Sequence, residues 1–128
     1  MDSRELGRRG ERRAAWFYRL RGYRVLARNE RSRGGELDLV VRRGGTIVFV
    51  EVKTRQSLAA GAGWEAVTRE KQLRVAALAG RYLARHPHAG AVRYDVLSLF
   101  WTGRRFLVTH FADAFRPEAD RRRPWRWI

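Results

Sequence analysis

The sequence predicts a single α/β domain with a mixed central sheet, in the order helix, three-strand meander, helix, strand, strand. Three observations predict this fold. Apolar residues recur at helical spacing in two stretches, around residues 3–21 and 68–85. Between them, residues 36–53 alternate in the manner of strands around a Gly-Gly turn. A further strand pattern at 92–100 follows the second helical stretch, which can serve as the crossover to a parallel neighbour.

The first helix is expected over residues 3–21. Asp2 suits the N-cap position, Glu5 three residues later resembles a capping box, and Gly22 ends the helix. The residues that recur at helical spacing, and should face the core, are Leu6, Gly10, Ala14, Phe17 and Leu20. A short first strand at 23–27 and a basic loop at 28–33 should follow.

The central feature is a hairpin around the turn Arg42-Arg43-Gly44-Gly45, whose glycines supply the positive φ of short hairpin loops. Strict alternation puts one set of first-strand side chains (Glu36, Asp38, Val40) on one face and the other set (Leu37, Leu39, Val41) opposite. The second strand likewise divides into Ile47, Phe49, Glu51 and Lys53 against Val48, Val50 and Val52. Both faces of this strand are apolar until Glu51, which indicates a central strand covered on both sides.

The second helix is expected over 68–85, with Thr68 as N-cap. Its expected core face consists of Leu73, Ala76, Ala77, Gly80 and Leu83. Strands at 92–100 and 106–111 complete the sheet. Asp95 within the first of them should pair with an Arg, and the alternative is that it supports the site. The domain should span 1–115. The small residues at 56–63 predict a mobile loop beside the site or a linker.

A formal net charge of +15 over 128 residues predicts a polyanionic partner. Nucleic acid, DNA in preference to RNA, is the expected partner. An anionic membrane surface is the competing one, but no strongly amphipathic basic helix with a broad apolar face stands out. With no apolar run near 18 residues, no signal-peptide pattern and no cysteine, we expect a soluble cytoplasmic protein without disulfides or thiolate metal sites.

Asp38, Glu51 and Lys53 are the candidate catalytic residues. Charged groups at the end of a buried strand are costly to desolvate unless they are paired or bind a ligand. If the two strands pair around the turn, these three side chains converge, and two carboxylates beside a lysine suit Mg²⁺ or Mn²⁺. The lysine could act on the attacking water or on the phosphoryl oxygen. The alternative is a salt-bridge cluster without a ligand.

Lysine is rare in this chain, which gives each lysine weight. Of 28 Lys and Arg residues, only Lys53 and Lys71 are lysine. An ammonium is a compact point charge whereas a guanidinium is planar and wider, so a tight metal site would distinguish them. Lys71 is therefore a candidate substrate-contacting residue, although a surface lysine remains the alternative.

Several further residues are candidate nucleic-acid contacts. Lys71 and Gln72 lie in the first turn of the second helix, where exposed amides and the helix dipole favour phosphate. Arg31 and Arg33 lie beside Gly34-Gly35, and Arg55 ends the strand that carries Glu51 and Lys53. The tail at 116–128, rich in Trp and Arg, could stack on bases, fold back onto the domain or mediate self-association.

Gly34-Gly35-Glu36-Leu37-Asp38-Leu39 and Val50-Glu51-Val52-Lys53-Thr54-Arg55 resemble the D…ExK core of the PD-(D/E)xK nuclease superfamily. The chain is most similar there to the YraN family, which is similar to archaeal Holliday-junction resolvases. Further matching segments within 7–100 are Gly10-Glu11, Arg21-Gly22-Tyr23, Ala27-Arg28-Asn29, Lys71-Gln72 and Tyr94-Asp95-Val96. Glu-Leu-Asp stands where many members of the superfamily have Pro-Asp.

The resemblance implies a restriction-endonuclease-like fold, a site Glu on the first helix, a branched or flapped DNA substrate and a homodimer. Glu11, at the border of the apolar stripe, is that Glu, although it could instead pair on the surface with Arg8 or Arg12. We thus expect a Mg²⁺-dependent DNA phosphodiesterase in which Asp38 and Glu51 hold the metal and Glu11 adds a contact. The alternative is a non-catalytic nucleic-acid-binding module on the same scaffold. A third is an interaction protein that docks through its tail.

Overall fold

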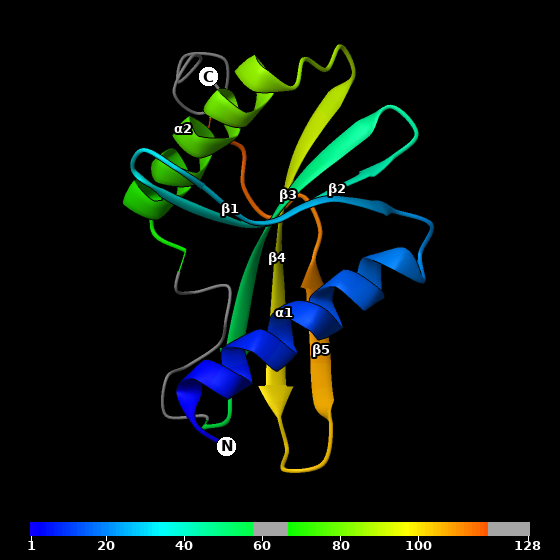
Figure 1. Cartoon of the computed structure of the whole chain (residues 1–128), viewed down its shortest axis with the longest axis vertical. Helices are drawn as coiled ribbons and strands as arrows, with labels where there is room; N and C mark the ends of the chain where they lie inside the picture. Colours follow the sequence, from blue (N-terminus) through cyan, green and yellow to red (C-terminus); the bar gives the residue numbers. More distant parts are fainter. Residues whose placement is uncertain (58–66, 118–128) are drawn as a thin grey trace, which may run out of the picture.

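A computed structural model of the chain describes residues 1–57 and 67–117 (Figure 1). Its elements are α1 (Ser3–Arg19), β1 (Arg24–Ser32), β2 (Gly35–Arg43), β3 (Thr46–Arg55), α2 (Arg69–Arg85), β4 (Ala91–Trp101) and β5 (Phe106–Phe111). The expected order of elements is confirmed. The five strands form one sheet in the order β1-β2-β3-β4-β5. Only the β3–β4 pair in this sheet is parallel, so the sheet is mixed and α2 makes the crossover.

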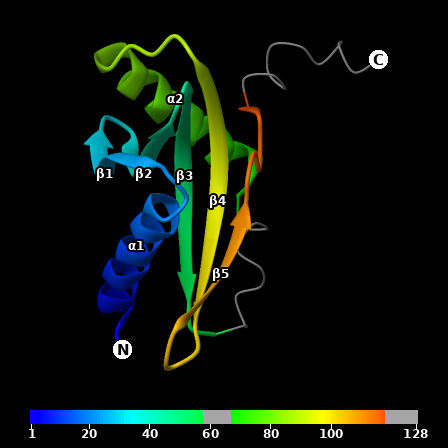
Figure 2. The ribbon, with the colours of Figure 1, turned by 90° about the vertical axis from the view of Figure 1, so that its right-hand side faces the viewer.

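The two helices lie on opposite faces of the sheet, and each covers its own core. On one face, α1 packs on a cluster that includes Val48 and Val50 of β3. On the other face, α2 packs on a cluster that includes Ile47 and Phe49. Strand β3 is therefore covered on both sides, as its two apolar faces predict. The β1–β2 hairpin turns away from the long strands β3 and β4 (Figure 2).

Strand β2 does not keep strict alternation, which corrects the predicted faces. Leu37 packs in the α2 cluster together with Val40, whereas Leu39 packs in the α1 cluster. The change occurs at Asp38, where the β2–β3 ladder has already ended at the pair Leu39↔Val50. Across β2, Asn29 of β1 adopts a positive φ of 52°, a left-handed conformation that Asn tolerates better than most residues. The two strands thus bend together at this point.

The predictions for the end of α1 and for the segment after it are also wrong. Helix α1 ends at Arg19, and Leu20, expected in the core, is the C-cap and 73 % exposed. The predicted basic loop at 28–33 is mostly strand, because the backbone of β1 pairs with β2 as far as Ser32. Basic side chains are tolerated there because β1 is an edge strand.

The buried face of α2 also differs from the expected one. It consists of Val75, Leu78, Ala79 and Tyr82. Of the expected residues Leu73, Ala76, Ala77, Gly80 and Leu83, none is fully buried, although Leu83 packs against the cluster while partly buried. The ring of Tyr82 packs edge-on against Phe49, so this aromatic residue fixes the rotation of the helix. Both predicted N-caps are confirmed, since Asp2 accepts from the Glu5 amide at 2.8 Å and Thr68 accepts from the Lys71 amide at 3.2 Å.

Asp95 is a buried structural carboxylate, and its predicted pairing with an Arg is confirmed. Its side chain is fully buried and accepts from Arg93 at 2.8 and 2.9 Å, from the Tyr18 hydroxyl at 2.7 Å and from the Asp113 amide at 2.9 Å. His110 Nε2 lies 2.8 Å from the same carboxylate. Burial raises the pKa of Asp95, but these hydrogen bonds outweigh burial and hold the pKa below its ordinary value.

Most of the predicted loop at 56–63 and of the tail at 116–128 lies outside the described residues. Neither helix in the described part of the chain has the length and apolar character that a bilayer span requires.

Candidate metal and phosphate site

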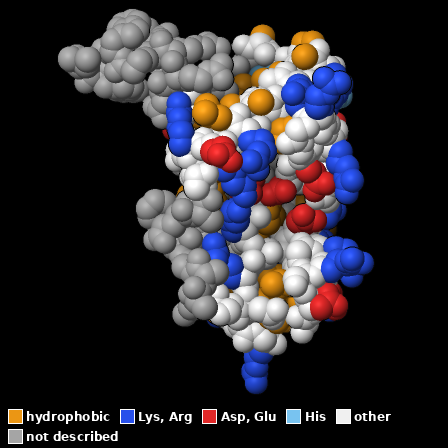
Figure 3. Space-filling view, turned by 90° about the vertical axis from the view of Figure 1, so that its left-hand side faces the viewer, with side chains coloured by type: hydrophobic (Ala, Val, Ile, Leu, Met, Phe, Trp, Pro, Cys, Tyr) orange, Lys and Arg blue, Asp and Glu red, His pale blue; other side chains and the backbone are white. Residues whose placement is uncertain are grey.

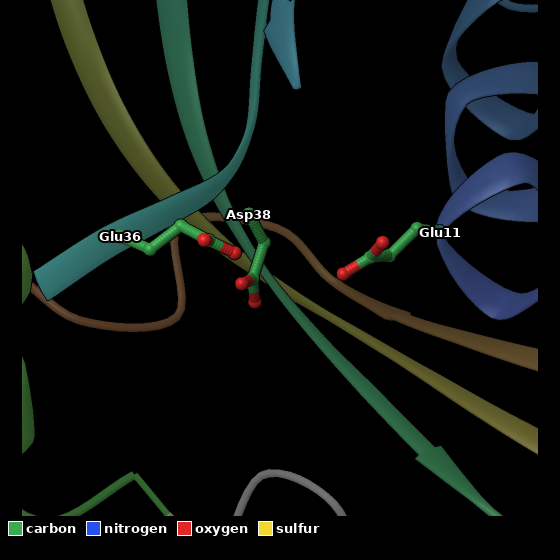
Figure 4. A group of neighbouring side chains, drawn as sticks. All are labelled: Glu11, Glu36 and Asp38. Atoms are coloured by element: carbon green, nitrogen blue, oxygen red, sulfur yellow. The ribbon is translucent and has the colours of Figure 1, made fainter. Parts of the chain in front are cut away.

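Three carboxylates meet where β2 bends away from β3. Oxygen atoms of Glu11, Glu36 and Asp38 all lie within 4.8 Å of one another. Figure 4 shows Glu36 and Asp38 extending from β2, and Glu11 reaching toward them from α1. Hard carboxylate oxygens at this spacing are the ligands that Mg²⁺ and Mn²⁺ prefer. One cation could therefore contact all three.

Asp38 is held by the backbone of the neighbouring strand. Its Oδ2 accepts a hydrogen bond from the amide of Val52 at 2.9 Å, at the point where the β2–β3 ladder has ended. The carboxylate thus replaces a backbone carbonyl as the partner of a strand amide. This hydrogen bond fixes Asp38 at the fork between the two strands, within reach of side chains from both layers.

The approach of α1 to β3 brings Glu11 to this fork. A Cβ atom on Gly10 would lie 1.9 Å from Cγ2 of Thr54, so only glycine permits this contact. The next residue, Glu11, accepts a hydrogen bond from the side chain of Asn29 at 3.2 Å. Asn29 is the residue with the positive φ in β1. The Gly10-Glu11 and Ala27-Arg28-Asn29 segments therefore both contribute to the position of the Glu11 carboxylate.

The carboxylate of Glu51 forms ion pairs with the ammonium groups of two lysines. Its Oε2 lies 2.8 Å from Nζ of Lys71 and 3.4 Å from Nζ of Lys53. The side chain of Glu51 is 13 % exposed, so these ion pairs are largely removed from solvent. The two lysines of the chain therefore meet at one carboxylate, although 18 residues separate them in sequence. Glu51 is not part of the carboxylate triplet around Asp38.

The two groups of charges act on each other. Burial, followed by the charge of Glu51, raises the pKa of Asp38 to about 7, and Glu11 adds to the rise. Burial, followed by the hydrogen bond with Lys71, lowers the pKa of Lys53. For Lys71, burial lowers the pKa, but its hydrogen bonds with Glu51 and Lys53 and the charges of Glu51 and Asp38 together outweigh burial, and the pKa is raised. The site thus contains more acidic charge around Asp38 than its surroundings neutralise.

The predicted nucleic-acid contacts fall into different environments. Arg31 pairs with Glu36 at 3.1 Å, and Arg33 is exposed at the β1–β2 turn. The Nε of Arg55, at the end of β3, is buried without a hydrogen-bond partner among the described residues. Gln72 donates to the carbonyl of Val67 at 3.3 Å, which ties it to its own helix end. The ammonium of Lys71 already forms an ion pair with Glu51.

Acidic and basic side chains are not mixed evenly on this side of the molecule. Figure 3 shows Asp and Glu side chains gathered in the middle of the face, with Lys and Arg on both sides of them. The cations that flank the carboxylates would attract a polyanion to this face.

Glu36 is the functional candidate that sequence reasoning missed. It stands two residues before Asp38, and strand alternation placed both on one face. That shared face was the available signal. The bend at Asp38 removed Leu37 and Leu39 from a common face but kept the two carboxylates together.

The motifs around this site can be compared with known proteins. A model of the uncharacterised protein family UPF0102 matches residues 10–99. The chain belongs to the UPF0102 family. This confirms the resemblance to the YraN family, which is the same family. All candidate site residues named above lie inside the matched segment.

Similar UPF0102 proteins come from several bacteria. One from Symbiobacterium thermophilum is 54 % identical over 98 residues, which cover 76 % of this chain and 83 % of the relative. One from a Parafrankia species is 50 % identical over 99 residues, 77 % of this chain and 84 % of the relative. One from Geobacter metallireducens is 40 % identical over 116 residues, 90 % and 95 % of the two chains.

Proposed function

We propose that this UPF0102 protein is a metal-dependent phosphodiesterase that hydrolyses nucleic acid, DNA in preference to RNA. The observation that carries the proposal is the position of Asp38, a carboxylate held at the strand fork beside Glu11 and Glu36 and acted on by the charge of Glu51. A protein that only bound phosphates would gain nothing from this excess of negative charge. A divalent cation would offset it.

The residues present fit such a cation. Asp38 is the central donor, and Glu11 and Glu36 supply further oxygens on either side. Glu51, which the ExK motif suggests as a ligand, borders the same charges but also holds Lys53 and Lys71. When bound, Mg²⁺ or Mn²⁺ would lower the pKa of a water and withdraw charge from a phosphoryl oxygen.

Lys53 is the residue that we assign to the reacting phosphate. In phosphodiester hydrolysis a water oxygen bonds to phosphorus, the bond to the leaving oxygen breaks, and the leaving oxygen takes up a proton. Glu51 fixes the position of the Lys53 amine at 3.4 Å. There it could orient the attacking water and offset the charge that grows on the phosphoryl oxygens. Its lowered pKa makes proton exchange with that water easier than for an exposed lysine.

The resemblance to PD-(D/E)xK nucleases supports the same proposal. The order of elements and the mixed sheet are compatible with a restriction-endonuclease-like fold, which we propose for this domain. Similarity to Holliday-junction resolvases adds branched or flapped DNA as the proposed substrate and a homodimer as the proposed assembly. A cytoplasmic location fits this activity and stays a prediction.

A second candidate function rests on Glu51. Because Lys53 and Lys71 both neutralise its carboxylate, the ExK motif could serve as a salt-bridge cluster within a nucleic-acid-binding module that has no turnover. Metal dependence separates the two functions, since the module would bind nucleic acid equally well with and without a divalent cation.

The test is cleavage of labelled duplex, single-stranded, flapped and four-way DNA, and of RNA, in Mn²⁺, Mg²⁺ or EDTA. We expect metal-dependent products from the wild type and none from Asp38→Asn, which keeps an acceptor for the Val52 amide. Glu70→Gln is the matched control, because Glu70 is an exposed carboxylate of α2 that pairs with Arg74. Binding of these substrates by the wild type without any cleavage, unchanged by metal, would overturn the proposal in favour of the binding module.

A further inference from the structure

A groove lined by arginines and aromatic rings lies on the side of α1 away from the carboxylates. It has a volume of about 340 Å³. Its walls are formed by Arg9, Arg12, Arg13, Trp16, Trp101 and Phe106. Among the described residues, no acidic side chain lines it. The first four residues come from α1, and the last two pair with each other at the β4–β5 hairpin.

Two of the three arginines of this groove, Arg12 and Arg13, have no neutralising partner among the described residues. The side chains of Arg12 and Arg13 make no hydrogen bond or ion pair with other residues in the described ranges 1–57 and 67–117, and Nη1 of Arg13 is buried. Arg9 pairs with Glu5 at 3.0 Å. A buried guanidinium atom without an acceptor is costly, and the cost is removed when an anion supplies the acceptor.

The aromatic residues of the groove are one exposed ring, Trp16, and two half-buried rings, Trp101 and Phe106. Trp16 is 52 % exposed, and the guanidinium of Arg19 lies over its ring at 5.2 Å. Trp101 and Phe106 contact each other with ring centroids 5.0 Å apart. An exposed indole ring beside guanidinium groups, such as Trp16, is a surface on which an unpaired base can stack, with phosphates held by the arginines.

Helix α1 connects this groove to the carboxylates. At 100° per residue, Trp16 lies about 140° around the helix from Glu11. Glu11 therefore faces the strand fork, while Trp16 faces the β4–β5 hairpin. The helix between them is about 10 Å wide, on the order of three steps of a DNA strand. One strand could thus contact both features.

We propose that the groove binds an unpaired stretch of nucleic acid, with a base stacked on Trp16 and a phosphate held by Arg12 and Arg13. This deepens the proposed function, on which it rests, because it specifies a substrate that contains single-stranded nucleotides. Base and phosphate are common to DNA and RNA, so both belong in the test.

The experiment measures fluorescence anisotropy of labelled oligothymidylate, oligouridylate and a blunt DNA duplex in EDTA, where binding is separated from hydrolysis. Trp16→Ala should weaken binding of the single strand about 5- to 150-fold, the range for loss of one stacked base. Trp16→Phe should retain most of the affinity. Duplex binding should change by less than about twofold, because paired bases cannot stack on the indole. Leu20→Ala is the matched control, since Leu20 is an exposed apolar residue at the end of the same helix.

The phosphate contact is tested by salt dependence. Arg13→Gln should reduce the slope of log affinity against log salt by about 0.7, the value for one contact with a single strand. Arg24→Gln removes the same charge at the opposite end of the sheet, where the backbone of Arg24 in β1 pairs with that of Arg42 in β2. This variant should leave the slope unchanged.

Any of three results would overturn the groove proposal. Trp16→Ala could bind the single strand as tightly as Leu20→Ala does, or it could lose affinity equally for duplex and single strand. It could also lose affinity only for anionic phospholipid vesicles. The outcome is distinguishable from that of the proposed function. Asp38→Asn should keep its affinity for the single strand in EDTA while losing cleavage. If the protein cleaves nucleic acid but Trp16→Ala binds the single strand as the wild type does, the proposed phosphodiesterase activity stands and the groove proposal is wrong.

Discussion

The ammonium of Lys71 lies 2.8 Å from the carboxylate of Glu51, so the first turn of α2 is tied to the end of β3. The same Glu51 oxygen lies 3.4 Å from Lys53. Two ammonium groups that share one carboxylate oppose each other, because only one negative charge is present for both. Burial and, after it, Lys71 lower the pKa of Lys53, whereas the pKa of Lys71 is raised, so the two amines form an uneven pair.

Replacing Lys71 should change the proton affinity of Lys53. In Lys71→Met, the pKa of Lys53 should rise toward its ordinary value, because the second ammonium no longer competes for Glu51. The chain has only two lysines, so ¹⁵N-lysine labelling gives two side-chain signals that can be titrated by NMR. The signal lost in the variant belongs to Lys71. An unchanged titration of the remaining signal would show that the two amines are independent.

Asp38 should make stability depend on pH and on metal. Its pKa of about 7 lies above that of an unfolded carboxyl, so its contribution is present at low pH and is lost as pH rises from about 4 through about 7. At pH 8 in EDTA, Asp38→Asn should therefore be more stable than the wild type, by about 1–3 kcal/mol after solvent screening. Thermal unfolding followed by circular dichroism measures both effects.

Added Mn²⁺ should reverse that order. A cation bound only by the folded wild type raises its stability in proportion to the logarithm of metal concentration over Kd. Asp38→Asn should gain little, because it lacks the central donor, whereas Glu70→Gln should respond as the wild type does. Equal stabilisation of wild type and Asp38→Asn by Mn²⁺ would place the bound metal elsewhere.

The order of elements could be predicted from sequence because local signals determined it. The glycines after Arg43 place the β2–β3 turn, and Thr68 places the start of α2. The apolar runs on both faces of β3 predicted its central position. The convergence of Glu51 and Lys53 follows from their positions two residues apart on one face of a strand.

The remaining details depend on tertiary contacts that alternation and helical spacing do not contain. Leu37 and Leu39 occupy different faces because Asn29 and Asp38 bend the hairpin between them. The rotation of α2 depends on the packing of Tyr82 against Phe49, which a stripe of small residues did not indicate. Strand β1 continues through Arg28 and Arg31 because β2 supplies backbone partners, although its charged sequence is typical of a loop.

Gly10 should be irreplaceable where α1 meets β3. In Gly10→Ala the new Cβ would lie 1.9 Å from Cγ2 of Thr54, so the helix must move and carry Glu11 with it. We expect a loss of about 1–3 kcal/mol in the free energy of unfolding, as for other overpacked sites, and weaker Mn²⁺ binding. Urea unfolding with and without Mn²⁺ measures both.

Gly7 supplies the matched control on the same helix. A Cβ there meets nothing within 4 Å, so Gly7→Ala should stabilise the protein by about 0.5–1 kcal/mol through helix propensity. Thr54→Ser removes the clashing methyl and should recover part of the loss in the Gly10→Ala background. A Gly10→Ala variant as stable as Gly7→Ala would mean that α1 does not approach β3 this closely.

Glu36 and Arg31 should affect metal binding in opposite directions. Glu36 is both a neighbour of Asp38 and the ion-pair partner of Arg31 at 3.1 Å, so a cation at Asp38 competes with the guanidinium for it. Glu36→Gln should weaken Mn²⁺ binding about tenfold, which is about 1.4 kcal/mol. Arg31→Gln removes the competitor and should strengthen binding by about 1.5- to 5-fold, the range for an exposed ion pair. Calorimetric titration of Mn²⁺ measures these changes, with Glu70→Gln as control. If Glu36→Gln binds Mn²⁺ as the wild type does while Glu51→Gln does not, the metal ligands are instead the set that the sequence indicates, Glu11, Asp38 and Glu51.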